Sequence, residues 1–249
     1  MVRRLIAIGY ALGLAGPVAL LCRCTASPPE ERVVFFGASI TEGWPLKGYF
    51  PGRPYVNRGQ GGELAFQMVQ RFDRDVVDLK PRAVVLKLCA INFVGTPGGS
   101  RPPRDGSAPA EPSRTHAVGP RAPGQGVTRA EYREMIDRAQ AAGIKPVLAT
   151  VVPVSKAWAD RKGPKVQEGI LAFNEWVKAE GRKRRLVVAD FHTALADAEG
   201  YASAPYTTDG LHVSPAGYAL MTKVVGPAID EALHGKAPLR GPKTPLRWP

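Results

Sequence analysis

Cysteine is scarce in this chain, which contains only Cys22, Cys24 and Cys89 among its 249 residues. The first two lie in an N-terminal segment discussed below, and Cys89 ends an apolar run of the kind found in buried strands. One remaining cysteine cannot form a disulfide within the chain or a cysteine-rich metal site. Clusters of His, Asp and Glu with the spacing of metal ligands are also missing, so we expect neither a metal nor an organic cofactor.

Acidic residues are too few to balance the basic ones, since 34 Lys and Arg face 22 Asp and Glu, a formal net charge of +12. Without residues 1–26, which include Arg3, Arg4 and Arg23, the balance is 31 to 22, or +9. Such an excess indicates either affinity for nucleic acid, anionic lipid or acidic polysaccharide, or only a solvated basic surface, which is the commoner case. We expect no nucleic-acid partner.

Internal repeats and coiled-coil patterns are absent as well, which excludes solenoid and fibrous architectures. The N-terminus has the pattern of a targeting segment: Met1–Arg4 is basic, Leu5–Leu21 is apolar, and Cys24–Ala26 offers small residues to a signal peptidase. We therefore expect residues 1–26 to be a signal peptide and the mature protein to be exported, either to the periplasm or as a secreted protein. The alternative is an uncleaved anchor in a membrane, because the apolar run approaches the length of a spanning helix, about 17–25 residues.

Between residues 27 and 235, short apolar segments alternate with amphipathic ones, as in a single α/β domain. Five segments rich in Val, Leu and Ile are predicted strands: Val33–Phe36, Tyr55–Asn57, Ala83–Cys89, Pro146–Val152 and Leu186–Asp190. Several are apolar throughout, which is typical of parallel strands covered on both faces. Repeated β-α units predict a doubly wound parallel sheet.

Helical patterns occupy the stretches between these strands. One helix begins at Thr128, with Glu131 completing a capping box, and stops at Gly143. The last helix is capped by Ser214 and has Pro215 at its first position. Two more helices carry apolar stripes at helical spacing, made of Phe66, Val69, Phe72 and Val76 in one and of Val166, Ile170, Phe173 and Val177 in the other.

Proline and glycine accumulate between Val94 and Val127, a stretch with seven of each and almost no large apolar side chain. Such a composition buries too little surface to order itself, so we expect a long mobile insertion over residues 94–127. It follows directly on Asn92-Phe93, and two roles stay open for it, a lid over a ligand site or a passive insertion. Residues 236–249 are rich in Pro and Arg and are predicted to form a tail.

Histidine, the usual general base, is restricted to His116, His192, His212 and His234. His116 lies in the insertion, His234 ends the last predicted helix, and His192 is expected to make a structural hydrogen bond after the fifth strand. His212 has a carboxylate held nearby, because Asp209 precedes it by three residues, about one helical turn. Such a carboxylate can hold one ring nitrogen while the other faces a nucleophile. The competing interpretation of these residues is a capped turn, since Asp-Gly is a common turn pair.

Ser39 is the candidate nucleophile for such a base. It follows the first predicted strand in Gly37-Ala38-Ser39, near the start of a helix, where unpaired backbone N–H groups could stabilise an oxyanion. A serine hydroxyl is a weak nucleophile until a base removes its proton, which His212 would do. Alternatively, Ser39 only caps the helix.

The placement of these residues favours a catalytic role. Ser39, the glycine cluster Asn57–Gly62, Asn92 and Asp209–His212 each follow a predicted strand or the element after it. In an open parallel sheet such positions converge at the carboxyl edge, where ligands bind. Gly62 could offer its backbone N–H, and Asn92 its amide, to the same oxyanion.

Four segments together resemble the SGNH or GDSL-type serine hydrolases, a family of esterases and lipases: Phe36–Gly43, Asn57–Gly62, Cys89–Asn92 and Asp209–His212. The resemblance covers nearly all of the chain after the signal peptide. It implies a flavodoxin-like three-layer α/β/α sandwich with a five-stranded parallel sheet, and a catalytic triad of Ser39, His212 and Asp209. It also implies oxyanion donors on the backbone N–H groups of Ser39 and Gly62 and on the side chain of Asn92.

The chain departs from the usual motifs of this family at three places. The usual Gly-Asp-Ser is Gly37-Ala38-Ser39 here, the usual Gly-x-Asn-Asp is Ala90-Ile91-Asn92-Phe93, and Glu63-Leu64 replaces an acid-threonine pair. No reacting group is lost, so we expect activity, with an altered rate and substrate preference.

The expected function is hydrolysis of carboxylic esters, with a small ester, an acylated sugar or a lipid as substrate. Two alternatives stay open, an acyltransferase on the same fold and a catalytically silent binder of anionic envelope polymer. The sequence does not specify the oligomeric state. It indicates membrane contact only through the N-terminal segment.

Overall fold

The computed structural model describes residues 31–94, 129–163 and 165–235. The predicted signal peptide (1–26), the insertion after Val94, the predicted helix start at Thr128 and the tail 236–249 lie outside the described residues. Within the described ranges, no helix combines the length and apolar character needed to cross a membrane.

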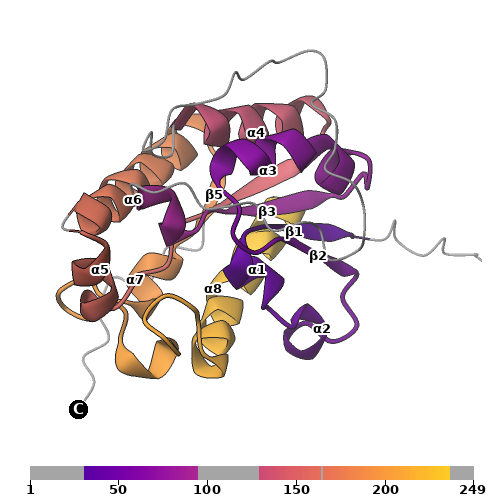
Figure 1. The fold of residues 1–249 in the computed structure, drawn as a ribbon. Coiled ribbons are helices and arrows are strands. Elements are labelled where there is room, and N and C mark those ends of the chain that lie inside the picture. The colour runs from indigo at the N-terminus through magenta and orange to yellow at the C-terminus, as the bar shows by residue number, and fades with distance from the viewer. Residues whose placement is uncertain (1–30, 95–128, 164, 236–249) are drawn as a thin grey trace, which may run out of the picture. The chain divides into compact units, whose positions relative to one another are not determined.

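A five-stranded parallel sheet forms the middle layer of the domain (Figure 1). Its strand order is β2-β1-β3-β4-β5. The strands are β1 (Val33–Gly37), β2 (Tyr55–Gly59), β3 (Ala83–Lys87), β4 (Lys145–Ala149) and β5 (Val187–Ala189). The predicted five-stranded parallel sheet is therefore confirmed.

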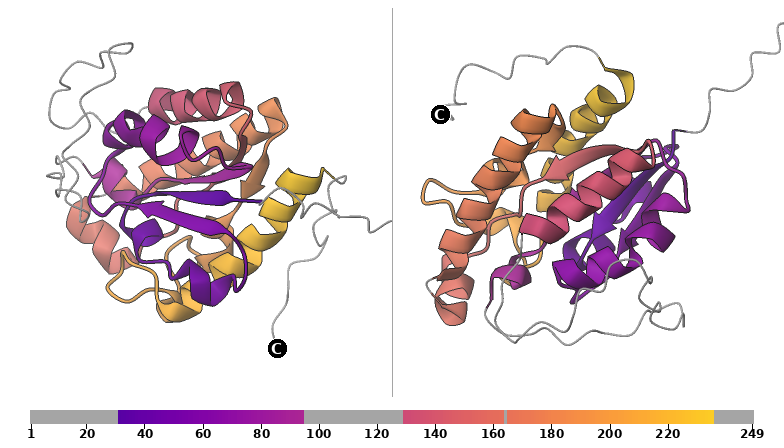
Figure 2. Two further views of the ribbon diagram at one scale, coloured as in Figure 1. Left: turned by 90° about the vertical axis from the view of Figure 1, so that its right-hand side faces the viewer. Right: turned by 90° about the horizontal axis from the view of Figure 1, so that it is seen from above.

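Helices cover both faces of this sheet, which makes the predicted three-layer α/β/α sandwich (Figures 1 and 2). One face packs against α3 (Ala65–Phe72), η1 (Asp73–Val77), α4 (Arg129–Ala141), α5 (Lys156–Lys162) and α6 (Lys165–Arg184). The other packs against α1 (Ser39–Glu42), α2 (Leu46–Tyr49), α7 (Phe191–Leu195) and α8 (Pro215–His234). Two 3-10 turns, η2 (Ala90–Phe93) and η3 (Ala204–Tyr206), lie in the connections.

Most predicted helix features are confirmed. The stripe of Val166, Ile170, Phe173 and Val177 is buried in α6. Ser214 caps α8 by accepting a hydrogen bond from the N–H of Gly217 at 3.1 Å, with Pro215 at the first position.

Phe66 is the exception. Its place in an apolar stripe predicts burial, but Phe66 is 37% exposed, while the other residues of the stripe are buried. It lies in the first turn of α3. The preceding residue of that turn, Ala65, is hydrogen-bonded to Asn92 in the connection after β3. The helix thus begins at the level of the loops beyond the strands, where less of the core is available to cover a side chain.

The predicted ends of β3 and β4 are also wrong. Pairing stops at Lys87 and Ala149 rather than at Cys89 and Val152. The residues beyond these ends, such as Leu88, are buried without belonging to a strand. An apolar run indicates burial and not strand pairing, and here the buried residues continue past the last hydrogen-bonded pair of the sheet.

The register of the strands determines where the loops leave the sheet. Gly37 lies opposite both Gly59 and Lys87, Lys87 lies opposite Ala149, and Ala149 lies opposite Ala189. All five strands therefore end at one level, and their carboxyl-terminal loops emerge side by side. This shared edge is where ligands bind in open parallel sheets.

Candidate active site

Ser39 is the first residue of α1 and follows the end of β1 after one residue, Ala38. The turn requires glycine at position 37, since a Cβ there would lie 2.2 Å from Thr41 Oγ1 and 2.7 Å from the carbonyl oxygen of Lys87. In the first turn of a helix the backbone N–H groups have no acceptor within the helix. The N–H of Ser39 is one of these groups. The Ser39 residue, which carries the candidate nucleophilic hydroxyl, is partly exposed.

The loop after β2 packs directly against the loop of Ser39. The N–H of Gln60 donates to the carbonyl oxygen of Gly37 at 3.0 Å. At Gly59 the backbones are so close that a Cβ would lie 2.0 Å from the nitrogen of Glu42. Only glycine fits such an approach.

Two glycines follow in this second loop. A Cβ built at Gly61 would lie 3.7 Å from Ser39 Cβ. Gly62 adopts φ +81°, a left-handed conformation that favours glycine. The sequence interpretation singled out Gly62 alone, and the structure adds Gly61 as a direct neighbour of Ser39.

Asn57 connects the same loops by hydrogen bonds. The sequence analysis gave this residue no individual role. Its Nδ2 donates to the carbonyl oxygens of Thr41 at 2.6 Å and Trp44 at 3.0 Å. Its Oδ1 accepts from the N–H of Gly59 at 2.8 Å. One amide thus fixes the end of α1 to the end of β2, and the available signal was a polar residue at the end of a predicted strand.

Asn92 lies in η2, after β3, and is 4% exposed. Its Oδ1 accepts from the N–H of Ala65 at 2.8 Å, and its Nδ2 donates to the carbonyl oxygen of Cys89 at 3.0 Å. A side-chain amide has two N–H donors. These contacts fix the orientation of the amide and leave its second N–H outside the bonds described.

Asp209 and His212 form the pair that the sequence spacing predicted. His212 Nδ1 lies 2.7 Å from Asp209 Oδ2, and Asp209 Oδ1 accepts from the N–H groups of Leu211 and His212 at 2.9 and 2.7 Å. Partial burial acts to raise the pKa of Asp209, but these hydrogen bonds outweigh it and lower the pKa to about 2. The carboxylate is therefore ionised, and it both closes a turn and holds the imidazole.

The turn that carries His212 is itself held from two sides. Gly210 has φ +87°, and a Cβ there would lie 2.2 Å from Ser155 Oγ, so both conformation and space require glycine. Thr207 Oγ1 donates to the carbonyl oxygen of His212 at 3.0 Å. This support fixes the backbone of His212 although its side chain is 43% exposed.

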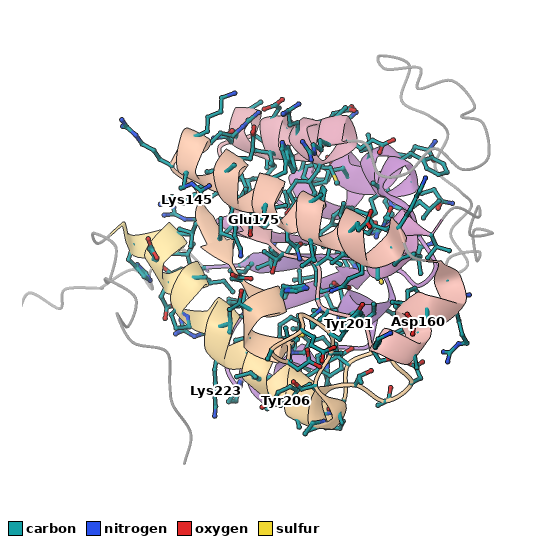
Figure 3. The ribbon with its side chains drawn as sticks, turned by 90° about the vertical axis from the view of Figure 1, so that its left-hand side faces the viewer. Lys145, Asp160, Glu175, Tyr201, Tyr206 and Lys223 are labelled. Atoms are coloured by element: carbon teal, nitrogen blue, oxygen red, sulfur yellow. The ribbon has the colours of Figure 1, made fainter. Side chains whose placement is uncertain are left out.

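Helix α8 links this turn to the loop of Ser39. The helix begins three residues after His212, beside Tyr206 (Figure 3), and the carbonyl oxygen of Tyr206 accepts from the N–H of Ser214 at 3.0 Å. The hydroxyl of Tyr218, one turn into α8, donates to the carbonyl oxygen of Ile40 at 2.8 Å. The residue after Ser39 is thereby tied to the helix that follows His212. Among the described residues, the side chains of Ser39 and His212 are not hydrogen-bonded to each other.

The remaining histidines are not arranged in this way. The N–H of His192 donates to Thr150 Oγ1 at 2.9 Å, but the ring Nε2 is buried with no hydrogen-bond partner among the described residues. The expected structural hydrogen bond is thus made by the backbone and not by this ring nitrogen. Burial lowers the pKa of the His192 ring. His234 Nε2 lies 3.7 Å from Glu31, and His116 lies outside the described residues.

In the described part of the chain, no group of three or more His, Cys, Asp or Glu side chains is arranged to hold a metal ion. What the described residues do assemble is a serine at a helix start, a hydrogen-bonded His–Asp pair and several oriented N–H donors at one sheet edge. Such groups are suited to proton transfer and to stabilising an oxyanion.

Comparison with known proteins identifies the family. Residues 35–220 match the model of the GDSL-like lipase/acylhydrolase family, which is more than half of the 249 residues. The chain therefore belongs to this family, whose members cleave ester bonds, and the sequence resemblance is confirmed. No protein among the curated ones matches the chain.

Solved structures of several bacterial proteins share the fold. A GDSL-like lipase from Bacteroides thetaiotaomicron is 26% identical, with a TM-score of 0.65 over 82% of this chain and 90% of its own. A lipase/acylhydrolase from Enterococcus faecalis is 20% identical, with a TM-score of 0.60 over 84% of this chain and 100% of its own. A catalytic mutant of an acetylxylan esterase from Geobacillus stearothermophilus is 16% identical, with a TM-score of 0.56 over 80% and 94%. The last two likenesses concern the fold alone.

Proposed function

We propose that the protein is an exported serine esterase that cleaves carboxylic esters through an acyl-enzyme. The observation that carries the proposal is the 2.7 Å contact between His212 Nδ1 and Asp209 Oδ2, on a turn tied through α8 to the loop of Ser39. The pair supports a tautomer in which Nδ1 carries the proton and Nε2 is the free base. Export is proposed from the composition of residues 1–26.

The acylation step follows from this arrangement. His212 Nε2 takes the proton of Ser39 Oγ as the oxygen attacks the ester carbonyl carbon, and the carbonyl π electrons move to its oxygen. The backbone N–H groups of Ser39 and Gly62 and the free N–H of Asn92 Nδ2 are the proposed donors to this oxyanion. The ionised Asp209 stabilises the imidazolium. When the carbonyl re-forms, the alcohol leaves with the proton of His212 and the acyl group stays on Ser39.

Deacylation repeats these steps with water in place of serine. His212 takes a proton from water, the hydroxide oxygen attacks the acyl carbon, and the proton returns to Ser39 Oγ as the carboxylic acid leaves. Acetylated carbohydrate is a substrate to include in tests, because acetylxylan esterases share the fold.

The test is steady-state kinetics on p-nitrophenyl esters of graded chain length, together with labelling by a fluorophosphonate probe. Ser39→Ala and His212→Ala should each lower kcat by roughly 10⁴-fold or more while keeping the fold. His234→Ala, an exposed histidine near the end of α8, is the matched control and should keep wild-type kinetics. Wild-type turnover by Ser39→Ala would refute the proposed nucleophile. Acyl transfer to an added alcohol in preference to water would refute hydrolysis as the main reaction.

A further inference from the structure

Arg71 is a buried arginine of α3 whose guanidinium donates four hydrogen bonds. Nε donates to Glu63 Oε2 at 2.7 Å, and Nη2 lies 2.6 Å from the same oxygen. Nη2 donates to the carbonyl oxygen of Gly37 at 3.0 Å. Nη1 donates to the carbonyl oxygen of Arg58 at 2.9 Å and to Asp75 Oδ2 at 2.8 Å.

All of these acceptors except Asp75, which lies in η1, belong to the two loops of the candidate active site. Gly37 precedes Ser39 by two residues, Arg58 precedes the Gly59–Gly62 loop, and Glu63 follows directly after Gly62. The guanidinium also lies over the ring of Phe36, with its carbon 4.3 Å from the ring centroid. One side chain therefore holds the backbone before the proposed nucleophile and both ends of the glycine loop.

Stability alone is a weak reason for such a group in this place. Burial of a charge is costly, and replacing a buried ion pair by apolar side chains is often neutral or stabilising. Burial raises the pKa of the Glu63 carboxyl even though Arg71 beside it acts in the opposite direction. The planar fork of arginine fits several fixed acceptors at once, whereas lysine offers three donors around one point.

We propose that Arg71 and Glu63 are positioning residues that fix the distance between the two loops, so that Ser39 Oγ and the N–H donors of the glycine loop converge on one ester carbonyl. The inference rests on the proposed function, in which Ser39 is the nucleophile. Neither residue takes part in bond making. Their effect is on the geometry of the groups that do, and a misplacement of about 1 Å can cost about 100-fold in rate.

A second ion pair with a buried carboxylate provides a matched control for stability. Glu180 is 4% exposed, compared with 5% for Glu63, and accepts from Arg184 Nε at 2.6 Å. This pair lies on α6 and touches neither catalytic loop. Glu63→Gln and Glu180→Gln therefore remove comparable buried carboxylates, one beside the candidate site and one away from it.

The experiment measures kcat and KM on p-nitrophenyl acetate, the rate of fluorophosphonate labelling and Tm for the full-length protein and both variants. We expect similar losses of Tm in the two variants. Glu63→Gln should lower kcat and the labelling rate roughly 10–100-fold with little change in KM, whereas Glu180→Gln should keep kcat within about twofold of wild type. If Glu63→Gln does not fold, Arg71→Lys is compared with Arg184→Lys by the same criteria.

Two results would overturn the inference, and Ser39→Ala measured in parallel tells them apart. If Ser39→Ala is inactive and Glu63→Gln turns over as fast as Glu180→Gln, the Arg71–Glu63 pair is only structural and the positioning role fails. If Ser39→Ala is as active as wild type, the proposed nucleophile fails, and the role given to Arg71 fails with it.

Discussion

Lys87 should make this protein less stable at neutral pH than a methionine at the same position would. It is the last residue of β3 and is 2% exposed. Its Nζ has one hydrogen bond, to the carbonyl oxygen of Leu88 at 3.3 Å, although an ammonium group has three donors. Burial lowers the pKa of the amine from 10.5 to about 8, and Cys89 opposes this only in part.

The size of the effect follows from the two pKa values. A difference of one in pKa corresponds to about 1.4 kcal/mol, so the fall from 10.5 to about 8 corresponds to about 3 kcal/mol of unfolding free energy. Below pH 8 both states carry the proton, and the folded state bears the full cost. Between pH 8 and 10.5 the unfolded chain keeps a proton that the folded protein has lost, so stability rises with pH. Above 10.5 the cost disappears.

Lys87→Met should therefore raise the free energy of unfolding at pH 7 by about 3 kcal/mol. The advantage should shrink as pH rises from 8 to 10.5. Urea unfolding at several pH values, followed by tryptophan fluorescence, measures both quantities. Lys145→Met is the control, because Lys145 is exposed at the other end of the neighbouring strand β4 (Figure 3) and should give no such pH-dependent difference.

Either of two results would refute this reasoning. If Lys87→Met were no more stable than wild type at pH 7, the amine would have to be solvated or paired in the folded protein. If the variant were more stable by a constant amount from pH 7 to pH 10.5, the gain would come from packing and not from the charge.

Further predictions concern the loops. Asn92→Ala should lower kcat by about 10²–10³-fold with a much smaller change in KM, and an effect on KM alone would contradict an oxyanion role. Gly59→Ala should destabilise the protein by at least about 1–3 kcal/mol, since its Cβ would lie 2.0 Å from the nitrogen of Glu42; an unchanged urea midpoint would contradict the close approach. Tyr218→Phe should cost about 1 kcal/mol in chemical unfolding through the lost bond to Ile40, and no loss would show that this link is not maintained in solution.

The part of the fold that local patterns determine could be predicted from the sequence. Apolar runs gave five strands, and the Ser214-Pro215 cap gave the start of α8. The spacing of Asp209 and His212 predicted their contact because three residues of one turn bring both side chains together. Strand ends were less predictable, since burial of Leu88 continues after pairing has stopped.

The supporting contacts could not be predicted in the same way. Arg71 bonds to Gly37, 34 residues earlier, and a charged residue on a helix is expected at the surface unless its partners are known. Similarly, Asn57 contacts the carbonyl oxygen of Thr41 only because two strands end at the same level. Such contacts depend on the assembled sheet and leave no local signal in the chain.

The two oxygens of Asp209 have separate tasks, Oδ1 in closing the turn and Oδ2 in holding His212. Asparagine could still accept with one oxygen and keep the turn, but it would lack the charge that stabilises an imidazolium. Glutamate would keep the charge, but its additional methylene would move the carboxylate relative to the N–H groups of Leu211 and His212. Under the proposed mechanism, Asp209→Asn therefore separates the shape of the turn from its chemistry: one substitution would leave a folded protein with a much lower turnover.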